Sequence, residues 1–223
     1  MKRLILSRKG FDSSAGGGPS PILDDGRIFS LPIPQKEKSP HRYSDLKFDE
    51  FNGEDFIKKI KCSVLPETFC HFDPRLDQEI GVFGQANAAQ TELKNRDIQI
   101  GDLFLFFGWF KDYSRYGKDL HHIFGWLQIN KIIEGEKKIK KFLLENNLLH
   151  PHGYKDVSRY KNNTLYIGAK KLSFDEKIFN CNGSGLFKKT HTDLILTEPQ
   201  MTRSNWKLPI DFLSSQEHQK ILK

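Results

Sequence analysis

Two aromatic segments in the middle of the chain constrain its fold most strongly. Residues 102–110 read Asp-Leu-Phe-Leu-Phe-Phe-Gly-Trp-Phe, and residues 122–133 read His-Ile-Phe-Gly-Trp-Leu-Gln-Ile-Asn-Lys-Ile-Ile. Aromatic and β-branched side chains favour strands, and the polar segment between the two runs is typical of a hairpin connection. We therefore predict that these segments pair as antiparallel strands at the centre of the protein.

The remaining elements are shorter. Of the 223 residues, 37% are apolar and 12% aromatic, with 18 phenylalanines, which is too much aromatic mass for a disordered chain. Apolar patterning predicts further strands at 4–7, 164–170 and 186–196, helices at 48–60 and 139–149, a short helix opened by the small residues at 86–89, and a closing segment at 206–213. The dipeptide Asp25-Gly26 lies between apolar runs and predicts a tight turn.

These elements predict a fold class. The sequence has neither an internal repeat nor a linker long enough to separate two domains. We therefore expect residues 1–223 to form a single α+β domain, built on a curved, mostly antiparallel sheet or partial barrel with a few peripheral helices.

Charge and cysteine content narrow the classes of function. The net charge of +7 suits a polyanionic partner without requiring one. The three cysteines, Cys62, Cys70 and Cys181, lack the pattern of a disulfide framework or a structural zinc site, which favours the reducing cytoplasm. The apolar run near the N-terminus is three residues long, so we expect neither secretion nor membrane insertion.

A loop rich in glycine and serine is the first candidate site. Residues 8–21 contain four glycines, two prolines and three serines, so they cannot form a regular helix or a central strand. The groups suited to a phosphate or sugar are those of Arg8, Lys9, Ser13, Ser14 and the backbone at Gly17, and Asp12 could act as a base. The spacing matches neither of the common glycine-rich phosphate motifs, and an ordinary surface loop is the alternative.

Histidines form the second group of candidates. His71 and Asp73 are two residues apart, so on an extended segment they face the same side and suit a general base with an orienting acid. His150 and His152 form a second pair, and His121-His122 a third cluster; several of them could converge, or they could be solvated loop histidines. Without a third ligand beside His71 and Asp73, the sequence predicts no metal site, and it identifies no cofactor.

Three further side chains suit recognition of a base. Gln85 stands among small residues that leave its amide free to donate and accept. Trp109 and Trp126 each follow a Phe-Gly pair and could place flat rings beside a cleft. Packing within the sheet is the stronger alternative for both indoles.

Several motifs together resemble a known family, the third of the bacterial and phage nucleotide-modification-associated domain families. These segments are Ile5–Ser14, Gly17–Ile22, Leu31–Pro34, His71–Pro74, Gly101–Phe110, Ile123–Gln128 and Trp206–Pro209. The resemblance implies a role near nucleic-acid base modification or phage conflict, with the active site in the loop 8–20. A second likeness, to base-binding barrels of the PUA, EVE and ASCH kind, rests on the turn at Gly101-Asp102.

We therefore expect a cytoplasmic enzyme that modifies a nucleotide or a DNA base, with DNA favoured over RNA as partner. In this hypothesis Arg8, Lys9, Ser13, Ser14 and Gly17 hold phosphate and sugar; Asp12, His71 and Asp73 are catalytic; and Gln85, Trp109 and Trp126 orient the base. The alternative is a reader that binds a modified base without transforming it.

Overall fold

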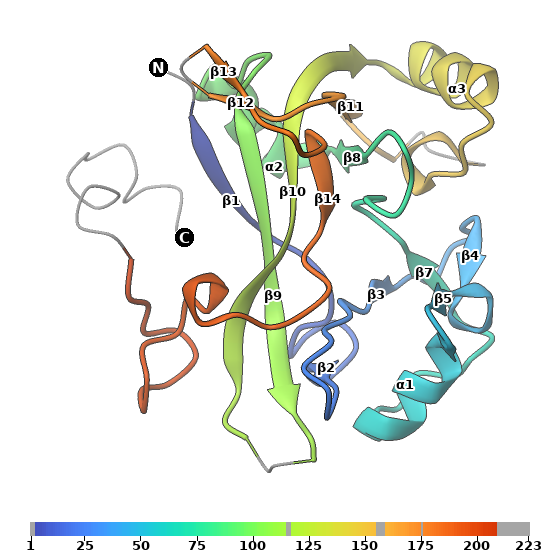
Figure 1. The fold of residues 1–223 in the computed structure, drawn as a ribbon. Coiled ribbons are helices and arrows are strands. Elements are labelled where there is room, and N and C mark those ends of the chain that lie inside the picture. The colour runs from blue at the N-terminus through green and yellow to red at the C-terminus, as the bar shows by residue number, and fades with distance from the viewer. Residues whose placement is uncertain (1–2, 115–116, 155–158, 175, 209–223) are drawn as a thin grey trace.

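The structure is a computed structural model that describes residues 3–114, 117–154, 159–174 and 176–208. It confirms the predicted α+β class: helices lie at the periphery of a sheet that does not close into a barrel (Figure 1). That residues 1–223 form one domain stays a prediction. Among the described residues, no helix combines the length and apolar character needed to span a bilayer.

The two aromatic segments form the predicted antiparallel pair. Strands β9 (Leu103–Asp112) and β10 (Leu120–Glu134) run side by side through the centre of the molecule (Figure 1). The register places Trp109 opposite His121 and Leu103 opposite Gln128, with an irregularity between Ile123 and Gly125. This hairpin is the scaffold on which the other strands assemble.

Seven strands make up the main sheet, in the order β1-β9-β10-β11-β8, with β2 also on β9 and β14 on β10. The added strands are β1 (Leu4–Arg8), β2 (Ser20–Ile22), β8 (Val82–Gln85), β11 (Thr164–Gly168) and β14 (Ser184–Leu186). Both β1 and β2 run parallel to β9, whereas the other pairings are antiparallel. The parallel β1 fixes where the N-terminal loop begins.

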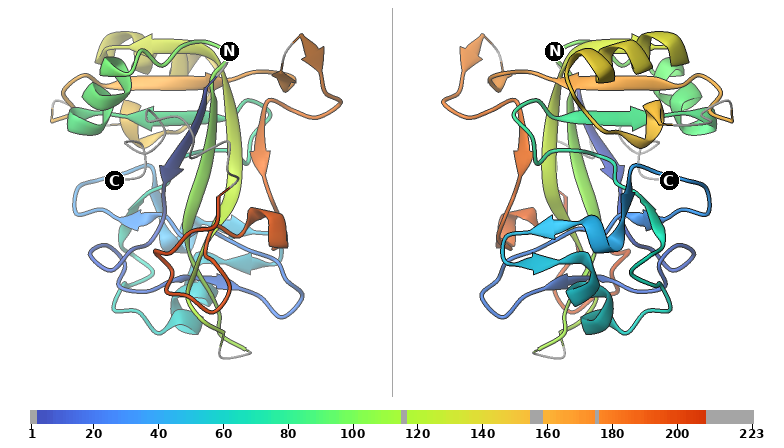
Figure 2. Two further views of the ribbon diagram at one scale, coloured as in Figure 1. Left: turned by 90° about the vertical axis from the view of Figure 1, so that its left-hand side faces the viewer. Right: turned by 90° about the vertical axis from the view of Figure 1, so that its right-hand side faces the viewer.

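Aromatic rings fill the core beneath this sheet. Phe83 of β8 packs edge-on against Phe104 and Phe106 of β9, with ring centroids 4.9 and 5.0 Å apart. A second cluster forms around α1 (Gly53–Ile60), where Phe56 and Tyr43 are fully buried. Helices α1 and α3 (Glu136–Glu145) lie at opposite ends of the molecule (Figure 2).

The smaller elements complete the fold. They are β3 (Ile33–Pro34), β4 (His41–Arg42) and β7 (Phe69–His71) in one small sheet, the pairs β5 (Lys47–Phe48) with β6 (Phe51–Asn52) and β12 (Ser173–Phe174) with β13 (Lys177–Ile178), the helix α2 (Asn87–Asn95), and the 3₁₀ turns η1 (Tyr43–Asp45), η2 (Pro151–Gly153) and η3 (Thr192–Leu194).

The helices differ from the prediction at their ends. The helix expected from residue 48 begins at Gly53, because Asn52 caps it: Asn52 Oδ1 accepts from the backbone N–H of Asp55 at 3.0 Å. The helix expected at 139–149 spans 136–145. The small residues at 86–89 do open a helix, α2, and the turn at Asp25-Gly26 is present, with Gly26 at φ 82°.

The strand predicted at 186–196 is wrong. The continuous ladder with β10 ends at Leu186, the chain then leaves the sheet through a polar stretch and the turn η3, and it returns to β10 in an isolated bridge between Ile195 and His122. The imidazole of His191 caps that turn by accepting from the backbone N–H of Asp193 at 3.3 Å. The apolar run at 186–196 is therefore a packed segment whose backbone hydrogen bonds to β10 do not form a continuous ladder. In the predicted closing segment 206–213, Trp206 packs on Phe107 with ring centroids 4.8 Å apart, and residues 209–213 lie outside the described residues.

Candidate functional site

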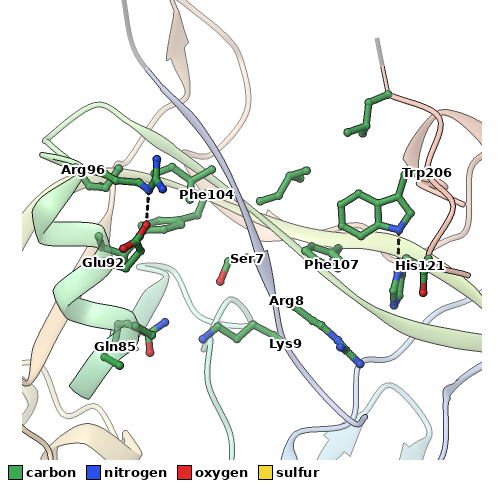
Figure 3. A pocket seen from close by; sticks show the side chains of 18 residues that line it. Ser7, Arg8, Lys9, Gln85, Glu92, Arg96, Phe104, Phe107, His121 and Trp206 are labelled. Carbon is green, nitrogen blue, oxygen red and sulfur yellow. Dashed lines mark hydrogen bonds and ion pairs between the residues drawn. The ribbon is translucent and has the colours of Figure 1, made fainter. Parts of the chain in front are cut away.

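A pocket of about 940 Å³ opens beside the end of β1 (Figure 3). It is bounded by β1, β9, α2 and the segment that carries Trp206. The small side chains Ala88 and Ala89 line it on the α2 side. Because these residues project little, the space beside the strand stays open.

Basic and aromatic groups share this pocket. Arg8 and Lys9 enter it from β1, and Phe107 and Trp206 supply flat apolar surface (Figure 3). Within the described part of the chain, neither a hydrogen bond nor an ion pair holds the Arg8 guanidinium. Gln85, at the end of β8, also lines the pocket. A free guanidinium beside aromatic surface suits an anion attached to a planar ring.

His121, which also lines the pocket, has a buried donor without a partner among the residues that the structure describes. Its Nδ1 accepts a hydrogen bond of 2.9 Å from the indole N–H of Trp206, so the proton of the neutral ring lies on Nε2. Of the buried side-chain nitrogen and oxygen atoms in the described residues, Nε2 of His121 alone has no hydrogen-bond partner. Burial, aided by Arg8 and Arg203, lowers the pKa of His121 to about 4, which keeps the ring neutral.

Next to Lys9 lies a second group of polar side chains, the His–Asp cluster, which we define as His71, Asp73, His150 and His152. His71 ends β7, Asp73 follows it, and the other two flank Pro151 at the start of η2. Gly84 makes the close packing possible, because a Cβ there would lie 2.3 Å from Cδ2 of His152. The cluster therefore draws on two separate parts of the chain and packs against a third at Gly84.

Hydrogen bonds fix the carboxylate of Asp73. Its Oδ1 accepts from the backbone N–H of Gly84 at 2.8 Å and from Nε2 of His150 at 3.0 Å. His150 donates there because its Nδ1 accepts from the backbone N–H of His152. The side chain of Asp73 is 1% exposed, and its Oδ2 lies 3.8 Å from Nε2 of His71.

Two amides fix the other imidazoles. Nδ1 of His71 lies 3.0 Å from Oε1 of Gln35, and Nδ1 of His152 lies 2.6 Å from Oδ1 of Asn163. Both amide groups are oriented by bonds from their NH₂ groups to backbone carbonyls. An amide oxygen only accepts, so each Nδ1 carries the proton and each Nε2 presents a lone pair.

Electrostatics within the cluster favour a charged carboxylate and neutral rings. Burial alone would raise the pKa of Asp73, but the bond from His150 and the charge of Lys9 hold it well below its usual range. Burial lowers the pKa of His71 to about 3 and that of His152 to about 4, against the opposing pull of Asp73. Burial also lowers the pKa of Lys9, while Asp73 opposes that shift.

Lys9 connects the pocket to the cluster. It lines the pocket, its Nζ lies 4.4 Å from the ring centroid of Phe83, and its charge acts on Asp73, His71 and His152. The four residues of the cluster do not line this pocket themselves, and Asp73 borders a second cavity of about 340 Å³, so Lys9 is the group that the pocket and the cluster share.

Beyond Arg8 and Lys9, the predicted binding and catalytic residues of the glycine loop lie outside the pocket. Asp12 forms a turn of its own: Oδ1 accepts from the backbone N–H groups of Ser14 and Ala15 and from the Ser14 hydroxyl, at 2.7 to 2.8 Å. Burial would raise the pKa of Asp12, but these bonds lower it. The residues that line the pocket do not include Asp12, Ser13, Ser14 or Gly17. Their predicted roles stay predictions.

The two predicted tryptophans pack instead of facing the pocket. The indole of Trp109 donates to Asp119 at 3.0 Å, and Arg203 lies 4.1 Å from its ring centroid. Trp126 donates to the carbonyl of Asn182 at 3.0 Å and packs on Phe187. Of the residues predicted to bind substrate, Arg8, Lys9 and Gln85 line the pocket together.

Several functional groups were missed by sequence reasoning. The aromatic wall uses Phe107 and Trp206, and the cluster is completed by His150 and His152. The two histidines were visible as a pair in His-Pro-His, although nothing in the sequence joins them to Asp73. Trp206 was visible in the apolar closing segment and in a motif of the family resemblance, but neither signal places it at a pocket.

The fold and site define a class: an α+β protein with an open basic and aromatic pocket beside a buried His–Asp cluster. The chain belongs to the family described as nucleotide modification associated domain 3, whose model matches residues 3–221. That membership confirms the resemblance seen in the sequence and associates the protein with nucleotide modification. Neither a curated protein nor a solved structure matches the chain.

Proposed function

We propose that the protein is an enzyme that modifies a nucleotide or a base in DNA. The observation that carries this proposal is the position of Lys9, which lies between an open pocket and the His–Asp cluster. Family membership supplies the substrate class, and the cluster supplies groups suited to proton transfer.

In the proposed complex, the pocket binds the nucleotide through two kinds of contact. Arg8 and Lys9 pair with phosphate oxygens, which suits a guanidinium that no other side chain of the described residues holds. The base lies against Phe107 or Trp206, where stacking tolerates different bases. The N–H of His121 at Nε2 then has an acceptor on the base, which removes an unpaired buried donor.

The chemistry is placed at His71 and Asp73. Asp73 is held on one oxygen by Gly84 and His150, so its second oxygen is available to the reacting group, with Nε2 of His71 at 3.8 Å. The reaction is a group transfer or a hydrolysis at this position.

We propose DNA as the favoured partner and the cytoplasm as the compartment in which the protein acts. The free thiols of Cys62, Cys70 and Cys181 suit a reducing compartment, and a role in phage conflict follows from the family resemblance. If the partner is a polymer, affinity falls steeply with salt, because bound phosphates release counterions. We expect Arg8→Ala to reduce the slope of log affinity against log salt by about 1.

Mass spectrometry of nucleosides tests the proposal directly. Total nucleotides and DNA are compared from cells with the wild-type protein, without it, and with Lys9→Met. We expect a new or missing nucleoside that depends on Lys9. The matched control is Lys137→Met, a change at an exposed lysine of α3 that should preserve the nucleoside profile.

The rival function is a reader that binds a modified base without turnover. The unpaired donor of His121 favours it, because recognition needs such a group even where no bond is made or broken. An unchanged nucleoside profile together with binding of modified DNA that His121→Phe abolishes would establish the reader and refute the enzyme.

A further inference from the structure

We propose that His71, Asp73 and His152 bind one divalent first-row transition metal ion. One ligand atom from each of the three residues lies within 4.8 Å of the other two. The sequence predicted no metal site because His71 and Asp73 lacked a third ligand, and the fold supplies it from residue 152. Two imidazoles and one carboxylate form the donor set used for zinc and for non-haem iron.

Lone pairs of the three side chains lie close together, as a cation requires. Nε2 of His71 and Nε2 of His152 carry no proton when each Nδ1 donates to its amide, and Oδ2 of Asp73 is an acceptor as well. Nε2 of His71 lies 3.8 Å from Oδ2 of Asp73, and one ring nitrogen of His152 lies within 4.8 Å of a ligand atom of each, so unprotonated acceptors converge here. Such an arrangement is unfavourable inside a protein unless a cation lies at its centre.

Outer contacts hold each ligand in place. Gln35 accepts from His71, Asn163 accepts from His152, and Gly84 with His150 donates to the far oxygen of Asp73. Metal-binding imidazoles usually donate their second N–H to a carbonyl or carboxylate in this way. The ring of Tyr160, stacked on His152 at 4.7 Å, restricts the second imidazole further.

The separations are close to those of a bound ion. A metal about 2.1 Å from each ligand atom would hold those atoms roughly 3.0 to 3.4 Å apart. The distance of 3.8 Å between His71 and Asp73 and the upper limit of 4.8 Å within the group exceed this only moderately. Small rotations of three side chains would therefore close the site.

Lys9 does not take the place of the ion. Within the described part of the chain, no ion pair within 4.0 Å joins its ammonium to Asp73, and Lys9 instead lies over the ring of Phe83. Three protein ligands leave coordination positions open for water or substrate, and a bound divalent ion lowers the pKa of such a water. The metal site deepens the proposed function by making His71 and Asp73 ligands of an ion instead of groups that transfer protons themselves. The catalytic meaning of the site rests on the proposed function, whereas metal binding itself does not.

Metal titration of the purified full chain tests the site. After treatment with EDTA and removal of the chelator, Zn²⁺ is titrated in competition with a chromophoric chelator, and Co²⁺ is followed by its absorption spectrum. We expect one equivalent per chain, at least a 100-fold loss of affinity in His71→Asn and in His152→Asn, and a 10- to 100-fold loss in Gln35→Met. The matched control His191→Asn changes an exposed histidine and should bind as the wild type does.

The outcomes separate the two proposals. Equal affinities in wild type, His71→Asn and His152→Asn, or no binding to the wild type, would overturn the metal site. A melting curve for each variant excludes loss of the fold as the cause of lost binding. Stoichiometric metal binding without any nucleoside change would retain the site and refute the proposed enzyme. If the chelator-treated protein modifies nucleosides and binds no metal, the proposed enzyme is retained and the metal site is refuted.

Discussion

The glycine loop and the His–Asp cluster differ in how far apart in the sequence their hydrogen-bond partners lie. In the loop, Asp12 is occupied by Ser14 and Ala15, its own neighbours in the chain. In the cluster, Asp73 is held by His150, 77 residues away, and by the backbone of Gly84. The loop therefore stabilises its own turn, whereas the cluster depends on the whole fold to bring its groups together. In the loop the bonds of Asp12 are local, whereas in the cluster each group is held on one side by a distant residue and leaves its other side facing the cluster.

The largest expected effect comes from comparing the two carboxylates. Asp73→Asn should reduce turnover at least 100-fold, because the amide cannot serve as a base or an anionic ligand. Asp12→Ala should reduce it less than about 10-fold, by loosening a turn outside the pocket. Nucleoside modification by the purified variants measures both, with melting curves as control. Greater loss with Asp12→Ala would return the active site to the loop.

Two glycines allow the same comparison in stability. Gly84→Ala places a methyl group 2.3 Å from Cδ2 of His152 and 2.8 Å from Cε1 of His150, within a buried region, and should cost about 1 to 3 kcal/mol. Gly17→Ala has open space, and its cost of about 1 kcal/mol comes from the positive φ of 79°. Denaturant unfolding measures the free energies. Equal losses would show that the cluster is no more tightly packed than the loop.

The pocket and the loop should respond to acid in different ranges. His121, which faces Arg8, Arg203, Phe107 and Trp206, has its pKa lowered from 6.5 to about 4 in the folded protein. The unfolded chain therefore binds more protons between these values, and stability from His121 falls as pH falls from 6.5 to 4. The lowered pKa of Asp12 gives stability that is lost only as pH falls below 3.8.

Unfolding free energies measured across this pH range test the difference. His121→Asn should flatten the profile between pH 6.5 and 4, and Asp12→Asn should flatten it only at lower pH. An unchanged slope in His121→Asn would contradict the burial of a neutral imidazole at this position.

The smallest effect is expected at Ser14. Its hydroxyl is exposed and bonds to Asp12 at 2.7 Å, so Ser14→Ala should change stability by less than about 0.5 kcal/mol and leave turnover nearly intact. Thermal melting and the nucleoside assay measure this. Abolished turnover at unchanged stability would show that the loop binds substrate after all.

The sequence predicted the parts of this protein that depend on local pattern. The aromatic alternation around Phe104 and Phe124 identified β9 and β10, and glycine and proline content identified the loop at 8–21. The spacing of His71 and Asp73 also pointed to the cluster. His152 could not be joined to them, because its approach depends on η2 packing beside Gly84. Leu186–Leu196 failed as a strand because apolar content reports burial and not pairing.

The end of β1 fixes two basic side chains next to each other. Arg8 ends the strand, and Lys9 is fixed next to it by a backbone bond of 2.8 Å from its N–H to the carbonyl of Phe107. Adjacent strand residues are separated by about 3.3 Å and project in different directions, so the strand end fixes the spacing between the two basic side chains. In the proposed complex we therefore expect selection by length: a ligand too short to extend from Arg8 past Lys9 would bind without reaching the cluster.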